Sequence, residues 1–296
     1  MNSSYEQKHP LYAASFTKRR KAMDLYEGGE RIEGNRAYLT RHTYESDKQY
    51  DIRASRATYR NFAAPIVDVF ASFINEGRPE RILPDALRPI EADADRYGMT
   101  ADAFFADVTR LAAAGGARFV IVDMEQKKGE TVAEDRASGR RLVPYFTSIS
   151  PDDVWDWGMD AKGLAWAVVH SEEMEHPAAF AAPLRYETLT VWTRDSWTRY
   201  RRPMKDKENT EYAIAEDGER KHGLGAVPLV PFLFEPTSPM TGLPATDDVL
   251  SLILRIYRRD SELDKMLFDR AVPLLNVGGV SQEHWTRSWS PAPTPS

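Results

Sequence analysis

The stretch TADAFFADVTRLAAAGGARFVIVD, residues 100–123, places a helix, a glycine turn and a strand in direct succession. Thr100 is a good helix N-cap, and Asp102 stands in the first turn, where a carboxylate favours the helix dipole. Gly115 and Gly116 end the helix. The run from 118 to 123 is short and rich in β-branched residues, which predicts a buried strand.

Further strand candidates follow this unit, and polar or glycine-containing turns separate them. They lie at residues 142–149, 164–171, 186–193, 196–200 and 211–215. The fold class predicted is therefore α+β, with mostly antiparallel pairing. Residues 216–218, Glu-Asp-Gly, are predicted to form a turn, and the prolines of the apolar run 224–235 argue against a regular central strand there.

Helical patterns flank the strands on both sides. The basic segment 18–26 ends at two glycines, which predicts a helix with a solvated charged face. Apolar residues recur at three- and four-residue steps over 47–75, which predicts one long helix that Pro65 would kink. Residues 247–270 predict another long helix. Its apolar stripe contains Val249, Ile253, Ile256, Leu263 and Leu267.

The amino-acid composition limits the classes of function that fit the chain. A chain of 296 residues with 42% hydrophobic content can bury a core. With 39 basic and 45 acidic residues it has a formal net charge of -6, which argues against a protein that grips nucleic acid over its whole surface. The absence of cysteine fits a reducing cytoplasm. Neither a signal peptide nor an apolar run long enough to span a membrane is found, so no membrane association is expected.

The search for catalytic motifs is negative. The sequence has no phosphate-binding loop, no dinucleotide fingerprint and no nucleophile elbow, so we predict no catalytic residue, no cofactor and no metal site. His170 and His176, the closest histidine pair, lack a metal-binding spacing. Asp93 with Asp95, or Asp152 with Asp153, could serve a divalent-metal-dependent nuclease, although turns and helix caps explain both pairs better.

Two clusters could bind polymers. The tryptophans are dense enough for a carbohydrate or base-stacking platform, although core packing is the favoured interpretation. They are Trp155, Trp157, Trp166, Trp192 and Trp197. The basic group is a nucleic-acid candidate, although glutamates follow closely and favour a solvated hairpin edge. It contains Arg199, Arg201, Arg202, Lys205 and Lys207.

The order of several segments resembles a known family. These segments are His9-Pro10-Leu11-Tyr12, the helical Tyr59-Arg60-Asn61-Phe62 leading into Val67-Asp68, Val143-Pro144-Tyr145, Ser150-Pro151-Asp152-Asp153-Val154 with Trp157, and HGLGAVPLVPF at 222–232. Together with the long helix that follows, they resemble the DUF4055 portal proteins of tailed bacteriophages. The resemblance covers residues 10–280, and its motifs are diffuse.

This resemblance implies a structural protein and not an enzyme. It implies a homo-oligomeric ring of about twelve copies at the portal vertex of the virion, assembled in the host cytoplasm. The ring would conduct double-stranded DNA in packaging and ejection and would dock the terminase large subunit, head-completion or adaptor proteins, and capsid or scaffold proteins.

The resemblance also implies a division of the chain. Residues 1–75 correspond to the helical part of the portal wing, 76–240 to its α+β domain, 241–271 to the stem helix, and 272–280 to the start of the clip. Residues 281–296 are expected to be disordered or non-native. Because portals continue well beyond a first stem helix, the chain is expected to be a shortened product that lacks the C-terminal part of the fold.

The stem helix would carry the functional residues. Arg255, Arg258, Arg259 and Lys265 are candidates for transient contacts with DNA phosphates, with inter-subunit ion pairs as the alternative. The apolar stripe of the same helix, from Val249 to Leu267, is the candidate for packing between subunits. Five basic and six acidic residues over 247–270 leave this helix near neutrality, which suits a wall along which DNA slides. The remaining alternatives are the nuclease and a carbohydrate-binding tail-associated module.

Overall fold

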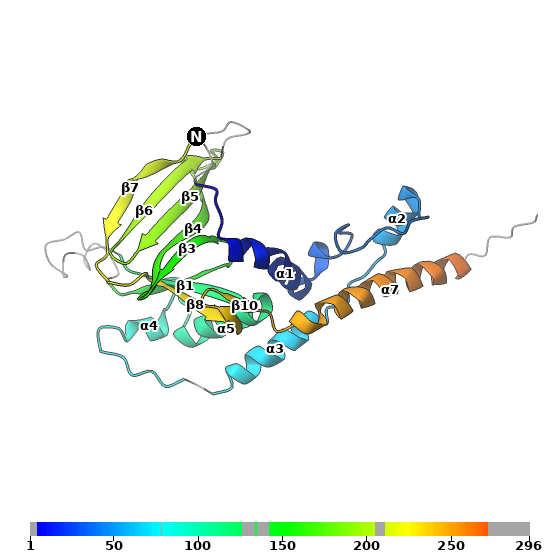
Figure 1. Cartoon of the computed structure of the whole chain (residues 1–296), viewed down its shortest axis with the longest axis horizontal. Helices are drawn as coiled ribbons and strands as arrows, with labels where there is room; N and C mark the ends of the chain where they lie inside the picture. Colours follow the sequence, from blue (N-terminus) through cyan, green and yellow to red (C-terminus); the bar gives the residue numbers. More distant parts are fainter. Residues whose placement is uncertain (1–4, 78, 126–133, 135–141, 205–210, 272–296) are drawn as a thin grey trace, which may run out of the picture. The chain divides into compact units, whose positions relative to one another are not determined.

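The computed structural model describes residues 5–77, 79–125, 134, 142–204 and 211–271 (Figure 1). The chain forms two compact units. The first contains residues 1–32 and 60–253, and the second contains 33–59 together with the residues from 254 onward. The expected clip strand and tail, residues 272–296, lie outside the described residues.

Antiparallel sheets dominate the first unit, which confirms the α+β class. A five-stranded sheet has the order β3-β4-β5-β6-β7, a three-stranded sheet the order β2-β1-β8, and β9 pairs with β10. The strands are β1 (Ala117–Asp123), β2 (Tyr145–Ile149), β3 (Val154–Asp160), β4 (Gly163–Glu175), β5 (Leu184–Thr193), β6 (Ser196–Pro203), β7 (Ala213–Lys221), β8 (Leu229–Leu233), β9 (Glu235–Ser238) and β10 (Thr241–Leu243).

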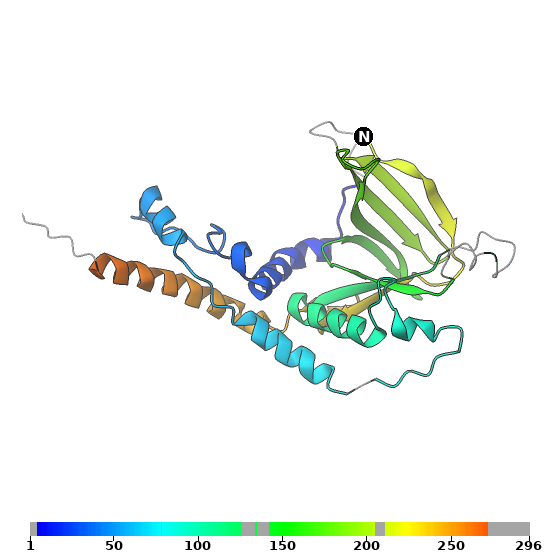
Figure 2. The same cartoon turned by 180° about the vertical axis from the view of Figure 1, so that it is seen from behind.

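The helices of the first unit are α1 (Pro10–Glu27), α3 (Ala63–Ile74), α4 (Pro89–Ala92) and α5 (Ala101–Gly115). Figures 1 and 2 show the three-stranded sheet between the five-stranded sheet and α5. The side chains of β1 explain this layering, because successive residues of a strand point to opposite faces. Phe119 and Ile121 pack with the five-stranded sheet, whereas Val120 packs with Phe104 and Val108 of α5.

The predicted helix–turn–strand unit is confirmed. The Thr100 hydroxyl accepts from the backbone N–H of Ala103 and begins α5. Gly116 ends the helix with a φ of 85°, in the left-handed region that glycine adopts without strain. A Cβ at this position would lie 2.5 Å from the carbonyl oxygen of Gly242, so the turn also brings α5 and β1 against β10.

The single long helix predicted for 47–75 is wrong, because two helices occupy this range. The first, α2 (Asp47–Ala54), begins at a capping box formed by Ser46 and Gln49. The second, α3, begins where the Asn61 side chain accepts from Ala64 N–H and donates to the carbonyl of Tyr26. Pro65 stands in the first turn of α3, where a missing N–H costs no helical hydrogen bond.

The turn predicted at 216–218 is also wrong, because these residues lie within β7. The pairing of β6 with β7 is irregular there: Thr198 faces Glu219, but Tyr200 faces Ile214. The turn-forming residues therefore form a bulge inside the strand. The run 224–235 contains β8, which lies at an edge of its sheet, as a strand containing Pro231 must.

The second unit contains α2 and most of α7 (Leu250–Ala271), which follows a short 3-10 turn over Asp247–Val249. Arg53 of α2 lies at its centre and pairs with Glu45 at 2.8 Å. The Arg53 guanidinium also donates to the hydroxyl of Ser261 in α7 and to the carbonyl of Thr40. Among the described residues, no helix is long and apolar enough to cross a membrane.

Candidate functional site

The helix α7 carries two apolar stripes. The first is covered by the chain itself and comprises Leu250, Ile253, Leu254, Tyr257 and Ser261, all of them buried. Their spacing of three and four residues places them on one face of the helix. Within the second unit, Tyr257 packs edge-on against Tyr59 with ring centroids 5.8 Å apart.

A second apolar stripe, which we call the outer stripe, lies about 130° around the helix at 100° per residue. It comprises Leu252, Ile256, Leu263 and Leu267 of α7 and begins with Val249 at the end of the preceding 3-10 turn; Val249 and Ile256 are half-buried. Leu252 and Leu263 are both 53% exposed and Leu267 is 58% exposed. Contiguous exposed apolar side chains of this kind mark an interaction surface.

The outer stripe contains four of the five residues expected to pack between subunits. Ile253 is the exception, because its side chain is 3% exposed and belongs to the covered stripe. Leu252, which the sequence reasoning missed, takes its place on the outer stripe. The sequence alone could not distinguish the two residues. Ile253 lies at the border between two apolar faces of the helix, and the periodicity of the sequence does not show which face the rest of the chain covers.

The four basic candidates of α7 do not share one face. Arg255 and Arg259 are exposed and lie one turn apart, beside the outer stripe. The Arg258 guanidinium donates to the carbonyl of Tyr38 at 2.8 Å. Lys265 lines a cavity of about 130 Å³ within the second unit, together with Arg56 and other residues of α2 and α7. Of the four basic candidates, only Arg255 and Arg259 are therefore both exposed and on the same side of the helix.

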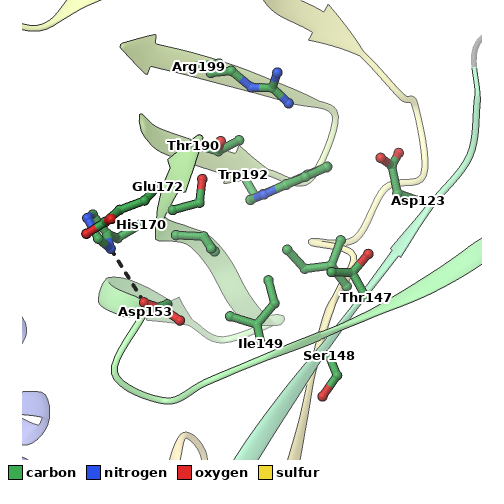
Figure 3. A pocket seen from close by; sticks show the side chains of 13 residues that line it. Asp123, Thr147, Ser148, Ile149, Asp153, His170, Glu172, Thr190, Trp192 and Arg199 are labelled. Carbon is green, nitrogen blue, oxygen red and sulfur yellow. Dashed lines mark hydrogen bonds and ion pairs between the residues drawn. The ribbon is translucent and has the colours of Figure 1, made fainter. Parts of the chain in front are cut away.

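A cavity of about 500 Å³, lined by both polar and apolar side chains, lies between the two larger sheets of the first unit (Figure 3). Asp123 stands on one side of it, and Asp153, His170 and Glu172 stand on the other, with Arg199 above. The carboxylate of Asp123 accepts from the hydroxyl of Tyr145 at 2.7 Å. Burial of that phenol, together with the adjacent Asp123 carboxylate, raises the pKa of Tyr145 to about 12.

The imidazole of His170 is held from three directions. Its Nδ1 lies 3.5 Å from Asp153 and its Nε2 lies 3.1 Å from Glu187. Its ring stacks on Trp155 with centroids 4.4 Å apart and planes 8° apart. The carboxylate of Glu187 also pairs with Arg202. His170 of β4 thus contacts Trp155 of β3, Asp153 just before β3 and Glu187 of β5, and Glu187 contacts Arg202 of β6, so these contacts stabilise the sheet.

The aspartates considered for a nuclease have structural partners. Asp93 accepts from the backbone N–H of Gly98, and Asp95 accepts from the N–H groups of Tyr97 and Met99. Asp152 pairs with Arg19 at 2.7 Å. Within the part of the chain that the structure describes, no group of three or more histidine, aspartate or glutamate side chains could hold a metal ion.

The aromatic and basic clusters also make contacts within the chain. Trp155, Trp157, Trp192 and Trp197 are between 6% and 9% exposed and belong to one core cluster, which confirms their interpretation as core. The guanidinium groups of the hairpin edge pair with glutamates of neighbouring strands: Arg199 with Glu173, Arg201 with Glu173 and Glu175, and Arg202 with Glu187. Lys205 and Lys207 lie outside the described residues.

No family model and no curated protein matches the chain. Within the described residues, the outer stripe of α7 is an apolar surface that the packing of the chain leaves uncovered.

Proposed function

We propose that this chain is a structural subunit of a portal ring of a tailed bacteriophage. The outer stripe of α7 is the observation that carries the proposal. A helix that already packs one stripe inside its own chain and exposes a second has the surface that a neighbouring subunit requires. The resemblance of the ordered segments to portal proteins gives the class of assembly.

In this proposal α7 is the stem helix and the sheets of the first unit belong to the wing. Double-stranded DNA would pass along the ring axis. The net charge of -6 suits such a channel, because a strongly basic surface would hold the DNA instead of letting it pass. Arg255 and Arg259 are available either to phosphates in the channel or to acidic groups of a neighbouring subunit. The terminase, adaptor and capsid contacts expected of a portal remain part of the proposal.

The two alternatives draw less support from the described residues. A nuclease needs carboxylates that are open to a metal ion, whereas Asp93, Asp95 and Asp152 accept from chain partners. A carbohydrate-binding surface needs exposed aromatic rings, whereas Trp192 and Trp197 are 7% and 9% exposed.

The proposal is tested by light scattering behind size exclusion, followed by negative-stain imaging of the largest species. The wild-type chain is expected to form rings with a central channel. Leu263→Glu, which places a charge in the outer stripe, is expected to abolish them, and Leu263→Met, which keeps the volume and polarity, is expected to retain them. Wild-type protein that stays monomeric at every concentration would refute the portal function.

A further inference from the structure

Strand geometry determines which side chains enter the cavity between the two larger sheets. Successive residues of a strand point to opposite faces of the sheet, and register partners on neighbouring strands share a face. Val169, Thr190 and Arg199 are register partners on β4, β5 and β6. Ser171 and Trp192 lie two residues from Val169 and Thr190, so they share that face. All five line the cavity from the side of the five-stranded sheet (Figure 3).

The three-stranded sheet supplies the opposite wall. Val120 of β1 packs against α5, so Ile121 and Asp123 point the other way, toward the five-stranded sheet. Thr147 is the register partner of Ile121, and Ile149 lies two residues further along β2. The cavity therefore lies between alternate side chains of β1 and β2 on one side and alternate side chains of β4, β5 and β6 on the other.

Other charged residues at the margin of the cavity belong to the opposite face of the five-stranded sheet. His170 and Glu172 occupy the alternate positions of β4, and the imidazole of His170 lies 3.5 Å from Asp153 on that face. Figure 3 shows these three side chains together, apart from Asp123 and Arg199. Within the described chain, the side chains that enter the cavity therefore include one carboxylate, of Asp123, and one guanidinium, of Arg199.

The inward side chains combine one charge of each sign with an apolar floor. The floor is formed by Ile121, Val169 and Trp192, all of them buried. A guanidinium binds a carboxylate through parallel N–H donors, and a carboxylate accepts hydrogen bonds from an ammonium group. We propose that the cavity binds a free amino acid, with its carboxylate at Arg199, its ammonium group at Asp123 and its carbon chain on the apolar floor.

Both charged groups can bind a further partner. The Asp123 carboxylate accepts from the Tyr145 hydroxyl at 2.7 Å and from the backbone N–H of Met124 at 2.8 Å. A carboxylate has about four acceptor positions, so an ammonium group can be added to these two donors. The Arg199 guanidinium lies 3.9 Å from Glu173, and its fork of N–H donors can serve a second carboxylate. The contacts within the chain hold both groups at the cavity wall.

The two charges select against ligands that carry a single type of charge. A phosphate ion at Arg199 would also meet Asp123, and a diamine at Asp123 would also meet Arg199. Like charges in close contact oppose binding, whereas an amino acid presents the opposite charge to each side chain. The cavity volume of about 500 Å³ falls in the range of small-molecule sites, roughly 300 to 1,000 Å³, so the space also suits a ligand of this class.

Calorimetric titration of the wild-type chain tests the proposal. The probes are L-leucine and ε-aminocaproate, two amino acids that carry their charges at different spacings. At least one should bind with a Kd of about 1 mM or below. Each has two matched analogues that lack one charge: isocaproate and isoamylamine for leucine, caproate and pentylamine for ε-aminocaproate. The loss of either charge should weaken binding roughly tenfold or more, because a charge-assisted hydrogen bond is lost.

Two variants test the roles of the two charged side chains. Asp123→Asn keeps an oxygen for the Tyr145 hydroxyl but removes the charge, and Arg199→Gln removes the guanidinium. Each should weaken binding roughly tenfold or more. Glu172→Gln is the matched control, because it removes a carboxylate from the opposite face of β4, and it should change the Kd by less than about twofold. Circular dichroism shows whether each variant is folded, and the analogue series needs only the wild-type chain.

The absence of any heat of binding from both amino acids at about 10 mM would overturn the proposal. So would equal affinity for an amino acid and for an analogue that lacks one charge, or a loss of affinity in Glu172→Gln as large as in Asp123→Asn. The inference goes beyond the portal function and does not depend on it. Rings without amino-acid binding would refute only the amino-acid site, and binding without rings would refute only the portal function.

Discussion

Arg53 and Glu45 form an ion pair that is almost entirely enclosed, with an N–O distance of 2.8 Å and side chains that are 2% and 5% exposed. The pair has further hydrogen-bond partners, because Arg53 also donates to the hydroxyl of Ser261 and the carbonyl of Thr40, and Glu45 accepts from the N–H of His42. It joins residues 40–53 to α7 within the second unit. A buried pair of this kind matters most when one partner is removed, because the other is left charged and without a partner.

Replacing Arg53 by methionine should therefore destabilise the second unit by about 3 to 5 kcal/mol. The control is Arg36→Met, because Arg36 pairs with Asp51 at 3.2 Å but both side chains are exposed, at 73% and 62%. An exposed pair contributes about 0 to 1 kcal/mol. Urea unfolding of both variants measures the difference, and equal losses would contradict the role of burial.

The same pair predicts a pH dependence. The hydrogen bonds from Arg53 lower the pKa of Glu45 from its ordinary value of 4.5 to about 2. A lowered carboxyl pKa contributes stability that is fully present above the unfolded value. This contribution should be lost as the pH falls from about 4.5 towards 2.

Unfolding free energies measured across this pH range check the prediction. The Glu45→Gln variant is the control, because its side chain does not titrate, and its stability should depend less on pH between 4.5 and 2. If Glu45→Gln and the wild type lost stability in parallel over this range, the Glu45 carboxylate would not be the group responsible.

Gly116 should tolerate no side chain. Both Gly116 and Gly163 have positive φ, at 85° and 99°, but only at Gly116 would a Cβ meet backbone, at 2.5 Å from Gly242. Gly163→Ala should thus cost about 1 to 2 kcal/mol for the left-handed conformation alone. Gly116→Ala should cost clearly more, since α5 and β10 must also separate. Thermal unfolding compares the two, and similar losses would show that the close approach is unimportant.

Asp152 should contribute to the stability of the fold and not to catalysis. Its carboxylate pairs with Arg19, whose side chain is 9% exposed, at 2.7 Å. Asp152→Ala should lower stability by about 1 to 3 kcal/mol, because the buried guanidinium loses its carboxylate partner. Incubation of the wild type with DNA and Mg²⁺ or Mn²⁺ should give no cleavage. Metal-dependent cleavage that disappears in Asp152→Ala would revive the nuclease alternative.

The sequence predicted the parts of the fold that local interactions determine. Helix α5 and strand β1 follow from the Thr100 cap, the two glycines and the β-branched run, all within 24 residues. The end of α2 and the beginning of α3 were missed, because the contact that starts α3 joins Asn61 to Tyr26, 35 residues away. Strand β3 was missed as well, because its mixture of tryptophan, aspartate and glycine has no simple alternation.

The candidate site was predictable only in outline. Periodicity showed that α7 is amphipathic, but the covered and outer stripes differ only in what the rest of the chain packs against them. The Arg53–Glu45 pair could not be predicted from the sequence, since its environment includes the hydroxyl of Ser261, 208 residues from Arg53. The exposed apolar side chains of α3, such as Val69 and Phe73, lie in a range predicted to form a longer helix, so their exposure became apparent only with the fold.

The most direct test of the portal proposal is the solution mass of the wild-type chain over a hundredfold range of concentration, determined by light scattering. Assembly through the outer stripe predicts species far above the 33.6 kDa of one chain at high concentration, with rings that have a central channel in negative stain. Leu263→Glu should remain at one chain mass throughout. A wild-type mass of 33.6 kDa at every concentration would contradict the proposal.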